Sequence, residues 1–331
     1  MAAGCGGGLP GARAASEFPV RRRQPSAGRG LPPAGRAARR ERGVSNVAEE
    51  RVMRVAAVVG AISLAALAVI HAQAADRQQS LVFSSDRSGA WRIWTVRPDG
   101  SGLAQLSRGA AEGEQDVDPA ISPDGRRILF TSTRGGAAGV WVMAADGSDA
   151  RRICDGDQAE WSPDGRTIVL RRGGRIFARD LAAGSEKPVT PADWTGCSGP
   201  TFSPDGKTVA FARLQDGSNA IYIVSADGGQ PRLVFGQKGA CEPHFSPDGA
   251  RIVYETETHL WTIAPDGTGN RPLTYFGGVQ RYGRFSPDGS QVVFCQAPSP
   301  QGPWELYVIP SAGGSPRRVT EGGSDMYPDW R

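Results

Sequence analysis

The sequence predicts an all-β protein built from a repeated four-stranded antiparallel unit, and three observations carry this prediction. First, the tetrapeptide Ser-Pro-Asp-Gly occurs five times, in steps of 40, 41, 43 and 40 residues. Second, the intervals contain short runs rich in β-branched and aromatic residues, each bounded by Gly, Pro, Asp or Ser. Third, no interval holds an apolar run long enough for a buried helix. The five copies begin at Ser122, Ser162, Ser203, Ser246 and Ser286.

The repeat that begins near residue 200 shows the elements of one unit. Its four expected strands are residues 200–203, 208–211, 220–224 and 232–234. Ser-Pro-Asp-Gly joins the first two strands, because proline fixes φ at the first turn position and glycine adopts the positive φ that follows. A second turn, with Asp-Gly or Gly-Gly, joins the later strands. It recurs at Asp99-Gly100, Asp146-Gly147, Asp227-Gly228, Asp266-Gly267 and Ala312-Gly313-Gly314.

The two ends of the repeat region complement each other. Residues 81–83, 91–96 and 104–106 supply the second, third and fourth strands of a first unit that lacks its innermost strand. Residues 327–330 match the start of an innermost strand. We therefore expect this C-terminal strand to complete the first unit, which also covers a sheet edge that would otherwise be exposed. One composite and five complete units predict a six-bladed β-propeller of four-stranded antiparallel blades over residues 75–331.

The repeats resemble the TolB-like, or WD40-like, β-propeller repeat, whose signature is Pro-x-[Phe/Trp]-Ser-Pro-Asp-Gly. The clearest copies begin at Pro200 and Pro243, and the resemblance covers nearly all residues after 80. It implies a propeller that binds a protein partner in the cell envelope. The interval between Ala75 and Leu81 has no room for the α/β domain that precedes the TolB propeller, so we expect a stand-alone propeller. The Gly-x-Ser-x-Gly signature of propeller-linked serine peptidases is absent from the sequence.

Residues 1–52 differ in composition from the rest of the chain. Eleven arginines and four glutamates give residues 1–54 a charge of +7, and Gly, Ala and Pro are abundant there. Such a segment cannot form a hydrophobic core, so we predict a disordered basic leader over residues 1–52. Two alternatives stay open: the leader is a basic arm for nucleic acid, or translation starts at Met53 and the leader is not made.

Residues 53–74 have the pattern of a secretory signal peptide. Met53 and Arg54 precede sixteen apolar residues, and Ala72-Gln73-Ala74 offers a cleavage site before Ala75. We therefore predict an exported protein, periplasmic or secreted, with an uncleaved short membrane anchor as the alternative. The whole chain carries a charge of +4, and residues 55–331 carry −3 without the basic segment before them. This negative charge argues against nucleic acid as a partner.

Cysteine and histidine set further expectations. Cys197 and Cys241 lie just before the innermost strands of neighbouring units, and an exported protein permits disulfides, so we predict a disulfide between them. The alternative is that the cysteines are buried free thiols. Beyond residue 74 only His244 and His259 remain, without the spacing of a zinc site, so we expect neither a metal nor a cofactor.

The candidate binding residues lie where the innermost strands, and the loops leading into them, line the mouth of the central channel. The side chains there differ from copy to copy on a repeated frame, which is where binding specificity can reside. Their acidic bias suits a cation or the basic end of a peptide, and solvated loop charge is the alternative. The candidates are Asp116, Asp118, Glu160, Asp193, Glu242, His244, Arg281, Arg284, Asp325 and Asp329.

We expect a non-enzymatic, monomeric propeller that binds a protein or peptide partner in the cell envelope and contacts the membrane only through an uncleaved leader. Two alternatives stay open. One is a hydrolase or lyase that uses carboxylates and His244 at the channel mouth, and the other is a sensor module that holds a small molecule or Ca²⁺. The scarcity of histidine and the lack of a catalytic motif count against the enzyme.

Overall fold

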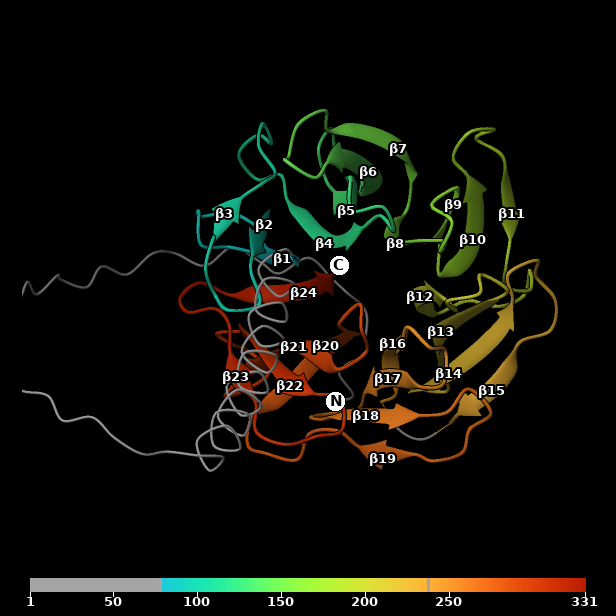
Figure 1. Ribbon diagram of the computed structural model, residues 1–331. Coiled ribbons are helices and arrows are strands. Elements are labelled where there is room, and N and C mark those ends of the chain that lie inside the picture. The colour runs from blue at the N-terminus through green and yellow to red at the C-terminus, as the bar shows by residue number, and fades with distance from the viewer. Residues whose placement is uncertain (1–78, 237–238) are drawn as a thin grey trace, which may run out of the picture. The chain divides into compact units, whose positions relative to one another are not determined.

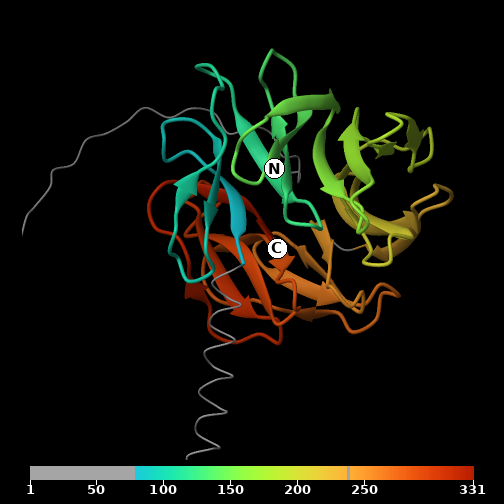
Figure 2. The same ribbon diagram turned by 45° about the horizontal axis from the view of Figure 1, so that its top comes forward.

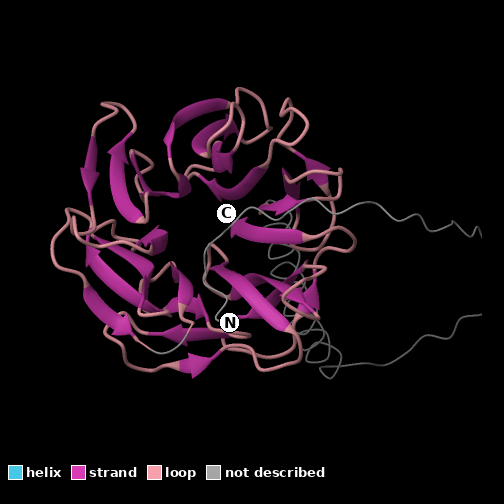
Figure 3. Ribbon diagram, turned by 180° about the vertical axis from the view of Figure 1, so that it is seen from behind, coloured by secondary structure: helices cyan, strands magenta, loops and turns pink. Residues whose placement is uncertain are grey.

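The computed structural model describes residues 79–236 and 239–331. In this part of the chain, 24 strands form six four-stranded antiparallel sheets, which are the blades of a six-bladed β-propeller (Figures 1 and 3). The predicted fold class is therefore confirmed. Each blade is a simple meander whose first strand lies at the central channel and whose last strand lies at the outer edge (Figure 1).

All six blades have the same order of strands from the channel outwards. Blade 1 contains β24 (Asp325–Trp330), β1 (Leu81–Ser85), β2 (Arg92–Val96) and β3 (Ala104–Gln105), and blade 2 contains β4 (Asp116–Ile121), β5 (Arg127–Ser132), β6 (Gly139–Ala144) and β7 (Arg151–Asp155). Blade 3 contains β8 (Asp157–Trp161), β9 (Thr167–Arg172), β10 (Arg175–Asp180) and β11 (Glu186–Pro188). Blade 4 contains β12 (Cys197–Phe202), β13 (Thr208–Gln215), β14 (Ser218–Ser225) and β15 (Arg232–Phe235). Blade 5 contains β16 (Cys241–Phe245), β17 (Ile252–Glu255), β18 (Leu260–Ile263) and β19 (Arg271–Pro272), and blade 6 contains β20 (Val279–Phe285), β21 (Gln291–Ala297), β22 (Glu305–Pro310) and β23 (Arg317–Arg318).

The ring closes where the last strand pairs with the first. Strand β24 runs antiparallel to β1, with Leu81 opposite Trp330 and Ser85 opposite Asp325. Figure 2 shows this red strand beside the cyan strands of the same blade. Arg87, in the turn after β1, donates two hydrogen bonds of 2.6 Å to the Asp325 carboxylate. The predicted closure by the C-terminal strand is therefore confirmed, and side chains as well as the backbone fasten it.

The repeated tetrapeptide makes the same turn in every copy. In blade 4, the Ser203 hydroxyl donates to Asp205 Oδ1 at 2.6 Å and accepts a hydrogen bond from the Thr208 N–H at 3.0 Å. Gly206 follows with a φ of +72°, a left-handed conformation that favours glycine. The other four copies repeat these contacts. The turn explains the recurring aspartates without any catalytic role.

Apolar side chains pack between neighbouring blades around the ring. Ile221 of blade 4, for example, shares a buried cluster with Ile252 and Tyr254 of blade 5. Between blades 2 and 3, the Trp161 indole N–H donates to the carbonyl oxygen of Ala120 at 3.0 Å. Each blade therefore covers the apolar face of the next, and burial of these faces stabilises the ring as a whole.

The predicted disulfide between Cys197 and Cys241 is wrong, because Cys197 is a free and buried thiol. Cys197 shares a cluster with Val169 of the preceding blade 3, whereas Cys241 shares one with Ile221 of the preceding blade 4. The two cysteines occupy related places, so the repeat puts them one blade apart instead of face to face. Packed sheets lie about 10 Å apart, whereas the Cα atoms of a disulfide lie within about 7 Å.

The predicted leader (residues 1–52) and signal peptide (residues 53–74) lie outside the described residues. Within residues 79–236 and 239–331, no helix has the length and apolar character that crossing a membrane requires. The structure therefore tests the propeller, and the export signal stays a prediction from sequence.

Candidate functional site

A β-bulge interrupts the innermost strand of every blade. At the bulge, one residue of each strand has a left-handed backbone with φ between +49° and +59°. Only blade 4 has glycine there, although this conformation costs other residues about 1–3 kcal/mol. Bulges of this kind re-aim side chains, and here they recur at the channel. We call these six residues the bulge ring: Asp118, Gln158, Gly199, Glu242, Tyr282 and Tyr327.

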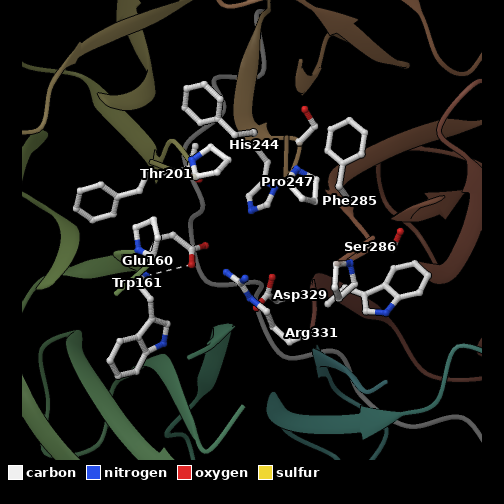
Figure 4. A pocket seen from close by; sticks show the side chains of 16 residues that line it. Glu160, Trp161, Thr201, His244, Pro247, Phe285, Ser286, Asp329 and Arg331 are labelled. Carbon is white, nitrogen blue, oxygen red and sulfur yellow. Dashed lines mark hydrogen bonds between the residues drawn. The ribbon is translucent and has the colours of Figure 1, made fainter. Parts of the chain in front are cut away.

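A second ring of side chains lies two residues further along each innermost strand, nearer the Ser-Pro-Asp-Gly turns. We call it the mouth ring, and it consists of Ala120, Glu160, Thr201, His244, Arg284 and Asp329. Four of its members, Glu160, Thr201, His244 and Asp329, line a cavity of about 220 Å³ at this end of the channel (Figure 4). The aromatic residues that follow them in sequence, such as Trp161, and the prolines of the turns complete the wall.

Two carboxyl groups dominate the chemistry of this cavity. Glu160 is 6% exposed and Asp329 is 3% exposed. Glu160 Oε1 accepts a hydrogen bond from the Trp161 N–H at 3.0 Å, and Asp329 Oδ2 accepts one from the Ile121 N–H at 2.7 Å. Each carboxyl keeps a second oxygen to which no described residue donates. Burial, followed by the charge of Asp329, raises the pKa of Glu160 to about 7.

The other ionisable groups at the mouth are His244, Arg284 and Arg331. Burial, followed by the Arg284 charge, holds the pKa of His244 well below its usual value, so this imidazole is neutral at pH 7. Its Nδ1 atom is buried without a hydrogen-bond partner, and the ring points into the cavity (Figure 4). Arg331 lies beside Asp329 at the same cavity, and its charge acts to lower the pKa of Glu160.

The bulge ring lies deeper in the channel and is also acidic. Gln158 Nε2 of blade 3 donates to Glu242 Oε1 of blade 5 at 3.4 Å, so side chains from non-adjacent blades meet across the channel. Burial and then Glu242 raise the pKa of Asp118 to about 7, and burial and then Glu255 raise the pKa of Glu242 to about 7. Among the described residues, no group of three or more His, Cys, Asp and Glu side chains is placed to hold a metal ion.

Two of the predicted site residues form ion pairs within their own blade and do not line the cavity. Asp116 and Asp325 are fully buried at the starts of β4 and β24. Asp116 forms an ion pair of 2.6 Å with Arg134, and Asp325 forms one of 2.6 Å with Arg87. The two pairs occupy equivalent places in blades 2 and 1. These two acidic residues therefore have partners in their own blade.

Asp193 and Arg281 also lie away from the cavity. Asp193 is exposed in the loop before β12, and Arg281 lies 3.7 Å from the buried carboxyl of Glu255. Sequence reasoning missed Glu255, although a charge at the end of the apolar strand Ile252–Glu255 is unusual enough to have identified it. It also missed Arg331, which occupies the position of the turn serine in the other copies and lines the cavity.

Comparison with known proteins agrees with this geometry. A sequence profile described as TolB beta propeller domain matches residues 73–192. The protein TolB homolog of Chlorobium luteolum is 31% identical over 267 residues, which cover 76% of this chain and 59% of that protein. The crystal structure of TolB from Acinetobacter baumannii superimposes with a TM-score of 0.65 at 19% identity, covering 77% of this chain and 67% of that chain. The chain is a TolB-like six-bladed β-propeller.

An uncharacterized protein of Agrobacterium fabrum shows a similar relationship to this TolB-like propeller. It is 28% identical over 177 residues, which cover 51% of this chain and 59% of that protein. Both curated relatives are therefore matched over less than two thirds of their own length. The shared part is the propeller scaffold, and the composition of the mouth ring must be interpreted from this chain's own residues.

Proposed function

We propose that this TolB-like propeller is an exported, non-enzymatic module that binds a protein or peptide partner at the Ser-Pro-Asp-Gly end of its channel. One observation carries the proposal: the mouth ring repeats one strand position in six blades with six different side chains. A position that served only the scaffold would repeat its residue, as the turn aspartates do. Side chains that differ from blade to blade on a constant frame are suited to recognition.

The chemistry of the cavity favours a basic group on the partner, such as a lysine side chain or an amino terminus. Glu160 and Asp329 each direct an oxygen without a described donor toward the cavity, and the neutral His244 adds no opposing charge. The Arg331 side chain lies beside Asp329 at the same cavity, which supports a cationic group at this place. The export part of the proposal is supported by the signal-like residues 53–74 and by the likeness to TolB.

Fluorescence anisotropy with two short labelled peptides tests this function on the full chain. The probes are Lys-Gly-Ser-Ser-Ser and Glu-Gly-Ser-Ser-Ser, each with fluorescein at its carboxyl end. We expect the lysine-headed peptide to bind more tightly. We expect the double variant Glu160→Gln, Asp329→Asn to weaken its binding by at least about tenfold, because charged hydrogen bonds are lost.

Asp193→Asn is the matched control, because it removes an exposed carboxylate outside the cavity. It should leave the affinity for the lysine-headed peptide unchanged. Circular dichroism should show that all variants keep the strand content of the parent chain. Equal binding of the two peptides, or an unchanged affinity in the double variant, would refute the proposed site.

A further inference from the structure

A second cavity, of about 530 Å³, lies between blades 4 and 5. Pro204 and Phe245 line both this cavity and the central one, so the two hollows adjoin on the same face of the propeller. Ile223 of β14 and Pro265, in the turn after β18, supply further apolar surface. We call this cavity the interblade groove. It continues the central cavity outward over an apolar floor.

The rim of the interblade groove is acidic. Asp205 and Asp248 belong to the Ser-Pro-Asp-Gly turns of blades 4 and 5, and both line the groove. Hydrogen bonds from Ser203 and Ser246 hold the pKa of these aspartates below its usual value, so both are ionised at pH 7. Each turn uses the Oδ1 atom, which leaves the Oδ2 atom of each aspartate without a described donor.

We propose that the groove receives the partner segment that adjoins its basic group, with apolar side chains on the floor and a second basic residue at the rim. This inference rests on the proposed function, because the central cavity anchors the segment. The charge of the rim favours this occupant, since Asp205 and Asp248 would repel the phosphates of a nucleic acid or of an anionic membrane. Leucine side chains buried on the floor would add affinity by removing apolar surface from water.

The repeat supplies matched controls for a test of the groove. Thr208 and Thr167 occupy the same position, five residues after the turn serine, in blades 4 and 3. Only Thr208 lines the interblade groove, so Thr208→Trp should fill it while Thr167→Trp leaves it open. In the same way, Asp248→Asn and Asp288→Asn alter the same turn chemistry, but only Asp248 lines the groove.

The experiment compares the labelled peptides Lys-Gly-Leu-Leu-Lys and Lys-Gly-Ser-Ser-Ser on the full chain by fluorescence anisotropy. We expect the leucine peptide to bind at least about tenfold more tightly, because each buried leucine contributes substantially. Thr208→Trp should abolish that advantage, and Thr167→Trp should preserve it. Asp248→Asn should lower the affinity for the leucine peptide by about threefold, which is the usual effect of losing an exposed ion pair, and Asp288→Asn should leave it unchanged.

The outcomes separate this inference from the proposed function. If the tighter binding of the leucine peptide is absent, or survives in Thr208→Trp as it does in Thr167→Trp, the groove is not the site of the adjoining segment. Binding of the amino-terminal lysine would in that case still depend on Glu160 and Asp329, and the proposed function would stand. If the lysine head shows no dependence on those two carboxyls, both the function and the inference fall.

Discussion

Glu242→Gln should change the pH dependence of stability, because Glu242 is a buried carboxyl in the bulge ring. Burial, followed by the charge of Glu255, raises the pKa of Glu242 from 4.5 to about 7 in the folded chain. The folded state therefore holds a proton that the unfolded state releases near pH 4.5. The contribution of this group to stability is complete below pH 4.5, falls as the pH rises to about 7, and stays constant above that.

The magnitude follows from the difference between the two pKa values. A difference of this size corresponds to about 3 kcal/mol for one carboxyl. Glutamine has nearly the same shape and never ionises, so it avoids this loss. We therefore expect the change that Glu242→Gln makes in the free energy of unfolding to be about 3 kcal/mol more stabilising at pH 8 than at pH 5. Asp118 adds to the effect in the same direction, because the Glu242 charge raises its pKa.

Urea unfolding of the full chain at pH 5 and pH 8, followed by circular dichroism, measures this difference. Glu257→Gln is the matched control, because Glu257 is exposed in the loop between β17 and β18 of the same blade. The control should shift the unfolding free energy by less than about 0.5 kcal/mol at either pH. If Glu242→Gln shifts the unfolding free energy equally at the two pH values, Glu242 does not retain a proton and the electrostatic argument for the channel fails.

Two further predictions concern ring closure and export. Asp325→Ala should lower the free energy of unfolding by about 3–5 kcal/mol, because Arg87, only 12% exposed, would lose its buried partner. Urea unfolding measures this, and a loss below about 1 kcal/mol would show that the pair does not fasten the closure. The exported protein should begin at Ala75, because Ala72-Gln73-Ala74 precedes it as a cleavage site. Amino-terminal sequencing decides this, and a mature chain that still contains Met53 would exclude cleavage.

The candidate site shows where sequence reasoning reaches its limit. The mouth-ring position could be identified from the repeat, and Glu160, His244 and Asp329 do line the cavity. Asp116 and Asp325 carried the same kind of signal, an acidic residue in a loop before an innermost strand. Their partners, Arg134 and Arg87, come from the turns that follow other strands, so only the folded blade could show that these aspartates are buried and paired.

The disulfide prediction failed for a related reason. Cys197 and Cys241 have similar places in neighbouring copies, and similarity along the sequence was interpreted as proximity. In a ring of repeats, equivalent positions are related by rotation and lie a blade apart. Contact instead joins different positions of adjacent blades, such as the Trp161 indole and the Ala120 carbonyl.

The amino-acid sequence by itself determined the six-bladed architecture and the chain segment that closes it, because strand periodicity and turn chemistry are local properties that repeat about every 40 residues. Tertiary structure alone decided which charges meet in the channel. The left-handed bulge at residues such as Asp118 and Glu242 re-aims each innermost strand, and side chains from blades that are distant in sequence then share one poorly solvated space. Burial and charge in that shared space, which no single repeat contains, set the pKa values and the binding chemistry of the mouth.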